Sequence, residues 1–162
     1  MKITDPCRQI EEAHTMQAQP VAQGEHAVRQ DQAAIRGLKD LFARGIVTKD
    51  SKLRASIWAR DGTLVPPTGG FFEGVAAIER DFERESASIT DRTTAQFSNY
   101  RFRFLTRDIA LVDADLTIRN VLGPDRKSVP VLQVSLVFTA VRQDDKWLVQ
   151  DERAHFVAAS PG

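Results

Sequence analysis

Cysteine is almost missing from this sequence. Cys7 is the only one among 162 residues, and the chain contains only three histidines. A single cysteine excludes an internal disulfide and a metal site built from several thiolates. His155 stands near the end of a predicted strand without a cysteine or a second histidine beside it, so we expect no metal ion.

Long apolar runs and an excess of charge of one sign are also lacking. No run approaches the roughly 20 residues that span a bilayer, and the opening MKITDPCRQIEEAHTMQ has no apolar core of the signal-peptide kind. Lys plus Arg and Asp plus Glu both number 22, so net charge gives no reason to expect nucleic acid or an anionic membrane as partner. We therefore expect a cytoplasmic protein with neither kind of partner.

The motifs of common cofactor sites and nucleophiles are missing as well. Gly69-Gly70 is not followed by the Lys-Ser/Thr pair of a phosphate-binding loop, and nothing indicates nicotinamide binding. Ser135 and Thr139 have no His–Asp order around them that is typical of a catalytic triad. The sequence therefore predicts no cofactor.

What is present suits one globular domain. Hydrophobic residues make up 42% of the chain and charged residues 27%, which is ordinary for a soluble protein. Residues 1–25 are rich in Gln, Glu, Ala and His, and we predict a poorly ordered arm there. Residues 26–157 form the predicted domain and residues 158–162 a short tail.

Helical spacing dominates the first half of the domain. Apolar residues recur every three or four positions from His26 to Arg44, and Gly45 is suited to end that helix. Asp50 or Ser51 can cap a second helix. The apolar side of this second helix is predicted to comprise Leu53, Ile57 and Trp58. A third amphipathic helix is predicted to begin after Gly74.

The second half of the domain changes to a period of two. Segments 97–105, 109–120, 131–141 and 147–157 alternate or are rich in β-branched and aromatic residues. Short turns between them predict an antiparallel meander, and a brief strand over Thr63–Val65 precedes the third helix. Helices followed by a run of strands indicate an α+β fold, with the helices on one face of a curved sheet.

Four segments resemble a known family. They are DQAAIRGLKDLF, KDSKLRASIWARDGTLVPPTGGFFEGVAAIE, RDIALVDADLTI and VFTAVRQDDKWLVQDERAHF. In this order, over roughly Gln30 to Val157, they resemble the nuclear transport factor 2-like superfamily and in particular its SnoaL-like branch. The resemblance implies a cone-shaped α+β fold in which a bent antiparallel sheet and the N-terminal helices enclose a cavity.

The resemblance also gives a place to the segment PPTGGFF. Glycines allow tight backbone turns and prolines stiffen a loop. The fold implies that this loop, with Phe71 and Phe72, lies near the cavity opening or at a subunit contact. The alternative is that the two phenylalanines fill the gap between helix and sheet.

The strand over residues 109–120 contains the strongest catalytic candidates. One face comprises Leu111, Asp113, Asp115, Thr117 and Arg119, and the other Ala110, Val112, Ala114, Leu116 and Ile118. By itself, this pattern predicts a buried apolar face and a solvated polar face. In the similar association domain of calcium/calmodulin-dependent kinase II, the polar face of this strand lines the cavity. That resemblance implies that Asp113 and Asp115 point inward.

Two buried carboxylates this close would raise one pKa and leave a proton donor beside a base. We therefore predict Asp113 or Asp115 as the general base, with Thr117 and Arg119 as ligand contacts. The alternative is an ordinary solvated face with an Asp–Arg pair.

Further ligand contacts are predicted on other segments. The kinase-domain resemblance implies that Glu152 points inward, although this chain has Asp151 and Arg153 where relatives often have histidine. The predicted aromatic walls are Trp58, Tyr100 and Phe138. The hydroxyl of Tyr100 could orient a ligand carbonyl, but aromatics at core spacing are structural by default.

Two functions remain open. The resemblance implies either a cofactor-independent isomerase, dehydratase or cyclase acting on a small apolar or polyketide-like molecule, or a non-catalytic ligand-binding or assembly module. The paired aspartates favour the enzyme, whereas the absence of the His–Asp arrangement of better-known relatives favours the module. We also expect a homodimer through the outer face of the sheet. The contact is predicted to involve Ala110, Val112, Ala114 and Leu116.

Overall fold

A computed structural model describes residues 19–158 of the chain. Most of the predicted arm, with Cys7, and all but the first residue of the predicted tail lie outside the described residues. By their internal contacts, residues 1–33 and 34–162 form two compact units, and helix α1 (Gln19–Val47) includes residues of both. No helix in the described part of the chain combines the length and apolarity needed to cross a membrane.

Helix α1 continues beyond its predicted end at Arg44. Gly45 is helical, so its prediction as the helix stop is wrong, and the chain reverses instead at Lys49, which has a φ of 57°. Close packing is the reason for a glycine here. A Cβ at position 45 would lie 2.5 Å from Cγ of Arg54 and 2.9 Å from the carbonyl oxygen of Asp50.

Two short helices follow α1. The predicted cap of α2 (Ser51–Ala55) is confirmed, because the backbone N–H of Leu53 donates to Oδ1 of Asp50 at 2.8 Å. Trp58 was predicted in this helix but begins strand β1 (Trp58–Val65), which pairs with the last strand of the sheet. Helix α3 (Val75–Glu85) begins after Gly74 as predicted, and Gly74 has a φ of 82° that favours glycine.

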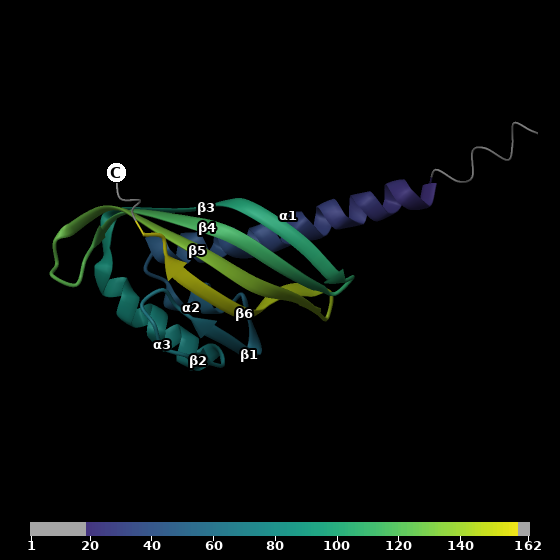
Figure 1. Ribbon diagram of the computed structural model, residues 1–162. Coiled ribbons are helices and arrows are strands. Elements are labelled where there is room, and N and C mark those ends of the chain that lie inside the picture. Colours follow the sequence, from purple (N-terminus) through teal and green to yellow (C-terminus); the bar gives the residue numbers. More distant parts are fainter. Residues whose placement is uncertain (1–18, 159–162) are drawn as a thin grey trace, which may run out of the picture. The chain divides into compact units, whose positions relative to one another are not determined.

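Six strands form one mixed sheet in the order β2-β1-β6-β5-β4-β3. The strands not yet introduced are β2 (Phe72–Glu73), β3 (Ile89–Thr106), β4 (Ile109–Leu122), β5 (Ser128–Gln143) and β6 (Lys146–Phe156). Strands β3 to β6 form the predicted antiparallel meander, and β1 adds a parallel pairing with β6. Figure 1 shows β3 to β6 side by side, with α2 and α3 grouped near β1 and β2. The α+β fold class is confirmed.

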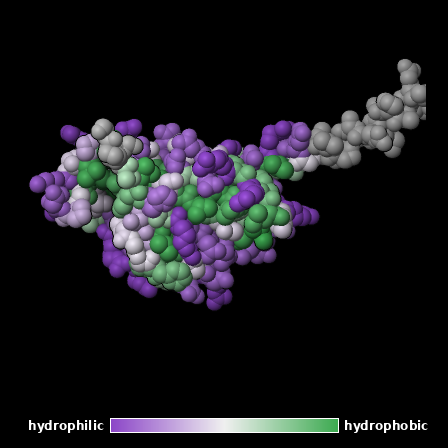
Figure 2. Space-filling model, in the orientation of Figure 1, coloured by the Kyte–Doolittle hydropathy of each residue, from purple (hydrophilic) through white to green (hydrophobic). Residues whose placement is uncertain are grey.

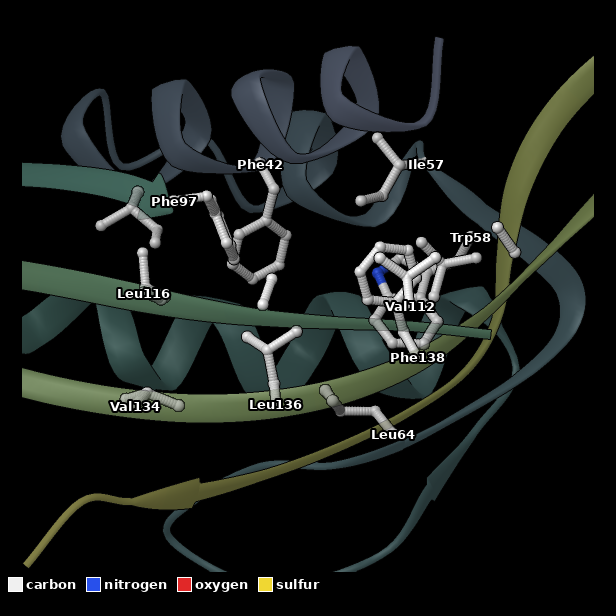
Figure 3. Packing of buried hydrophobic residues seen from close by; sticks show 14 of the residues in the cluster. Phe42, Ile57, Trp58, Leu64, Phe97, Val112, Leu116, Val134, Leu136 and Phe138 are labelled. Carbon is white, nitrogen blue, oxygen red and sulfur yellow. The ribbon is translucent and has the colours of Figure 1, made fainter. Parts of the chain in front are cut away.

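The core of residues 34–162 lies between the helices and one face of the sheet. Phe42 of α1 makes edge contacts with Phe82 of α3 and Phe97 of β3, with ring centroids 5.3 and 6.0 Å apart. Figure 3 shows Phe42 pointing from its helix towards the strands that carry Leu116 and Leu136. This core positions the inner face of the sheet directly under the helices.

The buried face of β4 is the apolar one that the alternation of the strand predicted, and not the polar one that the kinase-domain resemblance implied. This buried face consists of Ala110, Val112, Ala114 and Leu116. Asp113 and Arg119, on the opposite face, are exposed. The expectation that the apolar face forms the subunit contact is therefore wrong, because these side chains are already covered by the core of their own chain. Burying unpaired aspartates in their place would cost much more free energy.

Candidate ligand cavity

A cavity of about 610 Å³ lies within the unit of residues 34–162. Its wall combines α1, α3 and the inner faces of β4, β5 and β6, and is mainly apolar. The apolar lining includes Phe42, Ile46, Phe82, Leu116, Val134 and Leu136. Volumes of roughly 300–1,000 Å³ with few polar groups are typical of small-molecule sites.

Two connections contribute to the lining, whose exposed residues also include Arg84, Ala87 and Phe156. One is the Pro66–Thr68 segment after β1, and the other is the turn between β4 and β5 with Gly123, Pro124 and Arg126. The Pro/Gly loop thus contributes Pro66, Pro67 and Thr68 to the lining.

The two phenylalanines of that loop have different environments. Phe72 is half-buried and packs against the core, which agrees with the gap-filling alternative. Phe71 is 58% exposed, and its ring centroid lies 5.7 Å from Cζ of Arg153. Neither ring lines the cavity.

Glu152 of β6 lines the cavity and is 3% exposed. The ammonium group of Lys39, which is completely buried, donates a hydrogen bond to Oε2 of this carboxylate. The Lys39 Nζ also lies 4.3 Å from the ring centroid of Phe138. Burial lowers the pKa of Lys39, and the charge of Glu152 opposes that effect. The cavity wall thus holds a carboxylate whose counter-ion sits in the protein core.

Lys39 was not predicted as part of a site, although its spacing contained a signal. It follows Ile35 by four residues and precedes Phe42 by three, so it lies on the buried stripe of α1. A lysine on such a stripe needs a buried partner. Local spacing does not identify that partner, which is 113 residues away.

A buried arginine forms a second polar feature of the wall. Arg54 of α2 is 4% exposed, and its Nη2 donates to Oε2 of Glu85 at 2.6 Å. Its Cζ lies 3.9 Å from the ring centroid of Phe82 and 4.7 Å from that of Phe42. Burial lowers the pKa of Arg54, and the charges of Glu85, Asp81 and Glu152 oppose it. The sequence analysis did not single out Arg54.

Most of the predicted site residues lie elsewhere. Asp113 is exposed, and Asp115 accepts a hydrogen bond from Nδ2 of Asn99 at 2.8 Å on the outer face of the sheet. Thr117 and Arg119 share that face. The expectation that this face turns into the cavity is wrong, since none of the four residues lines it. A catalytic role for either aspartate stays a prediction.

The predicted aromatic walls belong to the packed interior instead. Trp58 and Phe138 are 3% and 1% exposed and lie in the core cluster. Tyr100 stacks on Phe102 with centroids 5.8 Å apart, and burial raises the pKa of its hydroxyl. None of the three lines the cavity. Glu152 is the one predicted site residue that the structure places in the cavity lining.

Between residues 19 and 158, no group of three or more His, Cys, Asp or Glu side chains is arranged to hold a metal ion. The buried charged residues of the lining are Glu152 and Arg54, which pair with Lys39 and Glu85.

Comparison with protein families finds one matching model. The SnoaL-like domain matches residues 27–153, which include every element from β1 to β6 except the last residues of β6. No match to a curated protein was found.

Several solved structures share the fold. The dehydrochlorinase LinA-type3, which acts on hexachlorocyclohexane and comes from Novosphingobium barchaimii, superposes with a TM-score of 0.72 at 16% identity, covering 85% of this chain and 94% of that one. A candidate scytalone dehydratase from Novosphingobium aromaticivorans gives 0.71 at 15%, covering 83% and 89%. A candidate calcium/calmodulin-dependent protein kinase II association domain from Xanthomonas campestris gives 0.64 at 20%, covering 76% and 85%. At these identities the likeness shows the fold.

Proposed function

Because the chain belongs to the SnoaL-like domain family, we propose that its cavity binds a small, mainly apolar molecule and that Glu152 acts on it. The observation that supports this most directly is the position of Glu152, a nearly completely buried carboxylate in a mainly apolar wall. Glutamate is almost never fully buried unless it is paired. Here the pairing with Lys39 comes from the core side and leaves the carboxylate beside the cavity.

Stability alone gives little reason to keep this ion pair. A buried pair can often be replaced by apolar residues of similar volume without loss of stability. A carboxylate at a ligand cavity, by contrast, can accept a hydrogen bond or a proton from a bound molecule. We therefore assign Glu152 the general-base role that the sequence analysis gave to Asp113 or Asp115.

The reaction class that fits best is a cofactor-independent isomerisation, dehydration or cyclisation. Each such reaction uses a base to remove a proton, and a desolvated carboxylate is suited to that step. Two proteins of similar fold are called a dehydrochlorinase and a candidate dehydratase, and both names denote eliminations. The second candidate function is a binding or assembly module that uses the same cavity without chemistry.

Ligand binding is tested with the polarity-sensitive dye Nile red. We expect saturable binding with a blue shift of its emission in the wild type. Val134→Trp places a large ring on the cavity wall and should abolish binding, whereas Val131→Trp, on the opposite face of the same strand, should leave it unchanged. Equal binding to both variants would place the dye outside the cavity and contradict the proposal.

A substitution of Glu152 distinguishes the enzyme from the non-catalytic binding module. Once a screen identifies a turned-over ligand, Glu152→Gln should bind it with similar affinity but lower kcat by about 10²–10⁴, the usual contribution of a general base. Unchanged turnover in this variant would remove Glu152 from the chemistry. A ligand that binds at the Val134 wall and is never converted favours the module.

We also propose that the protein forms a homodimer through the outer face of the sheet. The contact would use the mixed apolar and polar side chains of that face, not the buried set first expected. Val137 lies at its centre, paired with Asp113 on β4 and with Arg153 on β6.

A further inference from the structure

Arg54 has more hydrogen-bond donors than the protein uses. A guanidinium has five N–H donors. Within residues 19–158, the hydrogen bond found for Arg54 is the one from Nη2 to Glu85, and its buried Nε has no acceptor. Arg54 lines the cavity, and its Nη1 has no hydrogen-bond acceptor within residues 19–158, so this nitrogen is the donor available to a ligand.

We propose that Arg54 selects the ligand class, namely neutral apolar molecules with a carbonyl-type oxygen that accepts a hydrogen bond from the guanidinium. This inference rests on the proposed function, since it concerns the same cavity. It adds a donor to the same lining as the carboxylate of Glu152, so the ligand meets one donor and one acceptor in a mainly apolar wall.

The guanidinium is held in place before any ligand binds. It lies against the rings of Phe82 and Phe42, and Glu85 holds one edge through Nη2. Gly45 leaves room for the Arg54 side chain, because a Cβ there would approach Cγ of Arg54 to 2.5 Å. A donor fixed in this way loses little conformational entropy when a ligand oxygen binds it.

The surrounding charges favour a neutral oxygen over a carboxylate. Glu85, Asp81 and Glu152 all act electrostatically on Arg54, so its positive charge is already compensated. A ligand carboxylate would add a further negative charge near Glu85 and Glu152, which would repel it. A carbonyl oxygen accepts the hydrogen bond without that repulsion, and a pure hydrocarbon leaves the donors unsatisfied.

The other arginines of the lining do not provide the same selection. Arg84 has a side chain that is 67% exposed and donates to Oδ1 of Asp81 at 2.8 Å. Arg126 is exposed in the turn between β4 and β5. Solvent weakens the electrostatic effect of both groups on a ligand.

Three probes with one ring system test the inference on the full chain. They are 2-acetonaphthone, 2-ethylnaphthalene and 2-naphthoate, with Kd measured by displacement of Nile red. We expect the ketone to bind about tenfold more tightly than the other two, the size of effect of one well-made hydrogen bond. Arg54→Met, which keeps an apolar stem of similar length, should remove the advantage of the ketone over the hydrocarbon.

A second variant keeps Arg54 and removes the negative charge of its partner Glu85. Glu85→Gln should retain the preference for the ketone over the hydrocarbon and improve the affinity for 2-naphthoate, because one competing negative charge is gone. This variant and the wild-type probe series decide the question even where Arg54→Met does not fold.

The outcomes separate this inference from the proposed function. Equal affinities of the wild type for ketone and hydrocarbon would overturn the inference and leave a ligand cavity in place. Tightest binding of 2-naphthoate would overturn it in favour of an anion site. Failure of Nile red and all three probes to bind would overturn both.

Discussion

Lys39 and Glu152 form an ion pair from which water is almost excluded, with side chains 0% and 4% exposed. Each charge loses its hydration, and the attraction between them offsets that loss only while both are present. The rings of Phe138, Phe42 and Phe97, with centroids 4.3, 5.2 and 5.5 Å from the ammonium nitrogen, add cation–π attraction. This arrangement has a direct consequence for mutation.

Lys39→Met should lower the free energy of unfolding by about 3–5 kcal/mol, because it leaves the carboxylate of Glu152 buried without a counter-ion. The double variant Lys39→Met/Glu152→Met should recover most of that loss, since an apolar pair of similar volume is often neutral or stabilising. Urea unfolding measures both. A double variant as unstable as the single one would show that packing, rather than unpaired charge, causes the loss.

Tyr100 is the only tyrosine of the chain, so its ionisation can be followed by absorbance alone. Burial is the main reason that its pKa is raised above 10.0, and the negative charge of Asp40 adds to the effect. We expect the tyrosinate absorbance to titrate well above pH 10.0 in the native protein and near that value in denaturant. A native midpoint at the ordinary value would contradict the burial of this ring.

The raised pKa of Tyr100 also determines how the free energy of unfolding changes with pH. Above pH 10.0 the folded chain holds the Tyr100 proton more tightly than the unfolded chain, so the free energy of unfolding falls as pH rises through that range. Tyr100→Phe should lack this alkaline loss. At neutral pH it should unfold no more easily than the wild type, because the buried hydroxyl has no hydrogen-bond partner among the described residues.

At the scale of elements, helix α1 contains a matched pair of glycines. A Cβ at Gly37 meets nothing within 4 Å, whereas one at Gly45 meets Arg54 and the backbone of Asp50. Gly37→Ala should therefore stabilise the protein by up to about 1 kcal/mol through helix propensity. Gly45→Ala should destabilise it despite the same gain in propensity. Thermal unfolding of the two variants measures the difference, and equal shifts would refute the close packing of α1 against α2.

The element boundaries show where local patterns succeed. The alternation of β4 predicted its buried face correctly, because that pattern reports one element packed on one side. Trp58 was assigned to the wrong element, since an aromatic residue fits the apolar side of a helix as well as a buried strand. Pairing with Val149 of β6 decides its conformation, and that contact is remote in sequence.

For the whole molecule, we predict that sedimentation gives twice the chain mass of 18.1 kDa at micromolar concentration. The face shown in Figure 2 has apolar side chains in separate areas between hydrophilic ones. Val137→Glu, at the centre of the outer sheet face, should produce monomers, and Val131→Glu, near the start of that strand, should have less effect. A wild-type monomer at that concentration would refute the dimer.

The sequence by itself determined the α+β class, the strand meander and the buried face of β4, because short-range periodicity specifies which side of an element is apolar. It also indicated the inward position of Glu152, through the family resemblance. Only the tertiary structure decided that Lys39 and Glu152 meet, and that Arg54 and Glu85 border the same cavity. Such contacts depend on how helices pack across a sheet, and no local spacing encodes that geometry. The two ion pairs at the cavity could therefore be identified only in the folded chain.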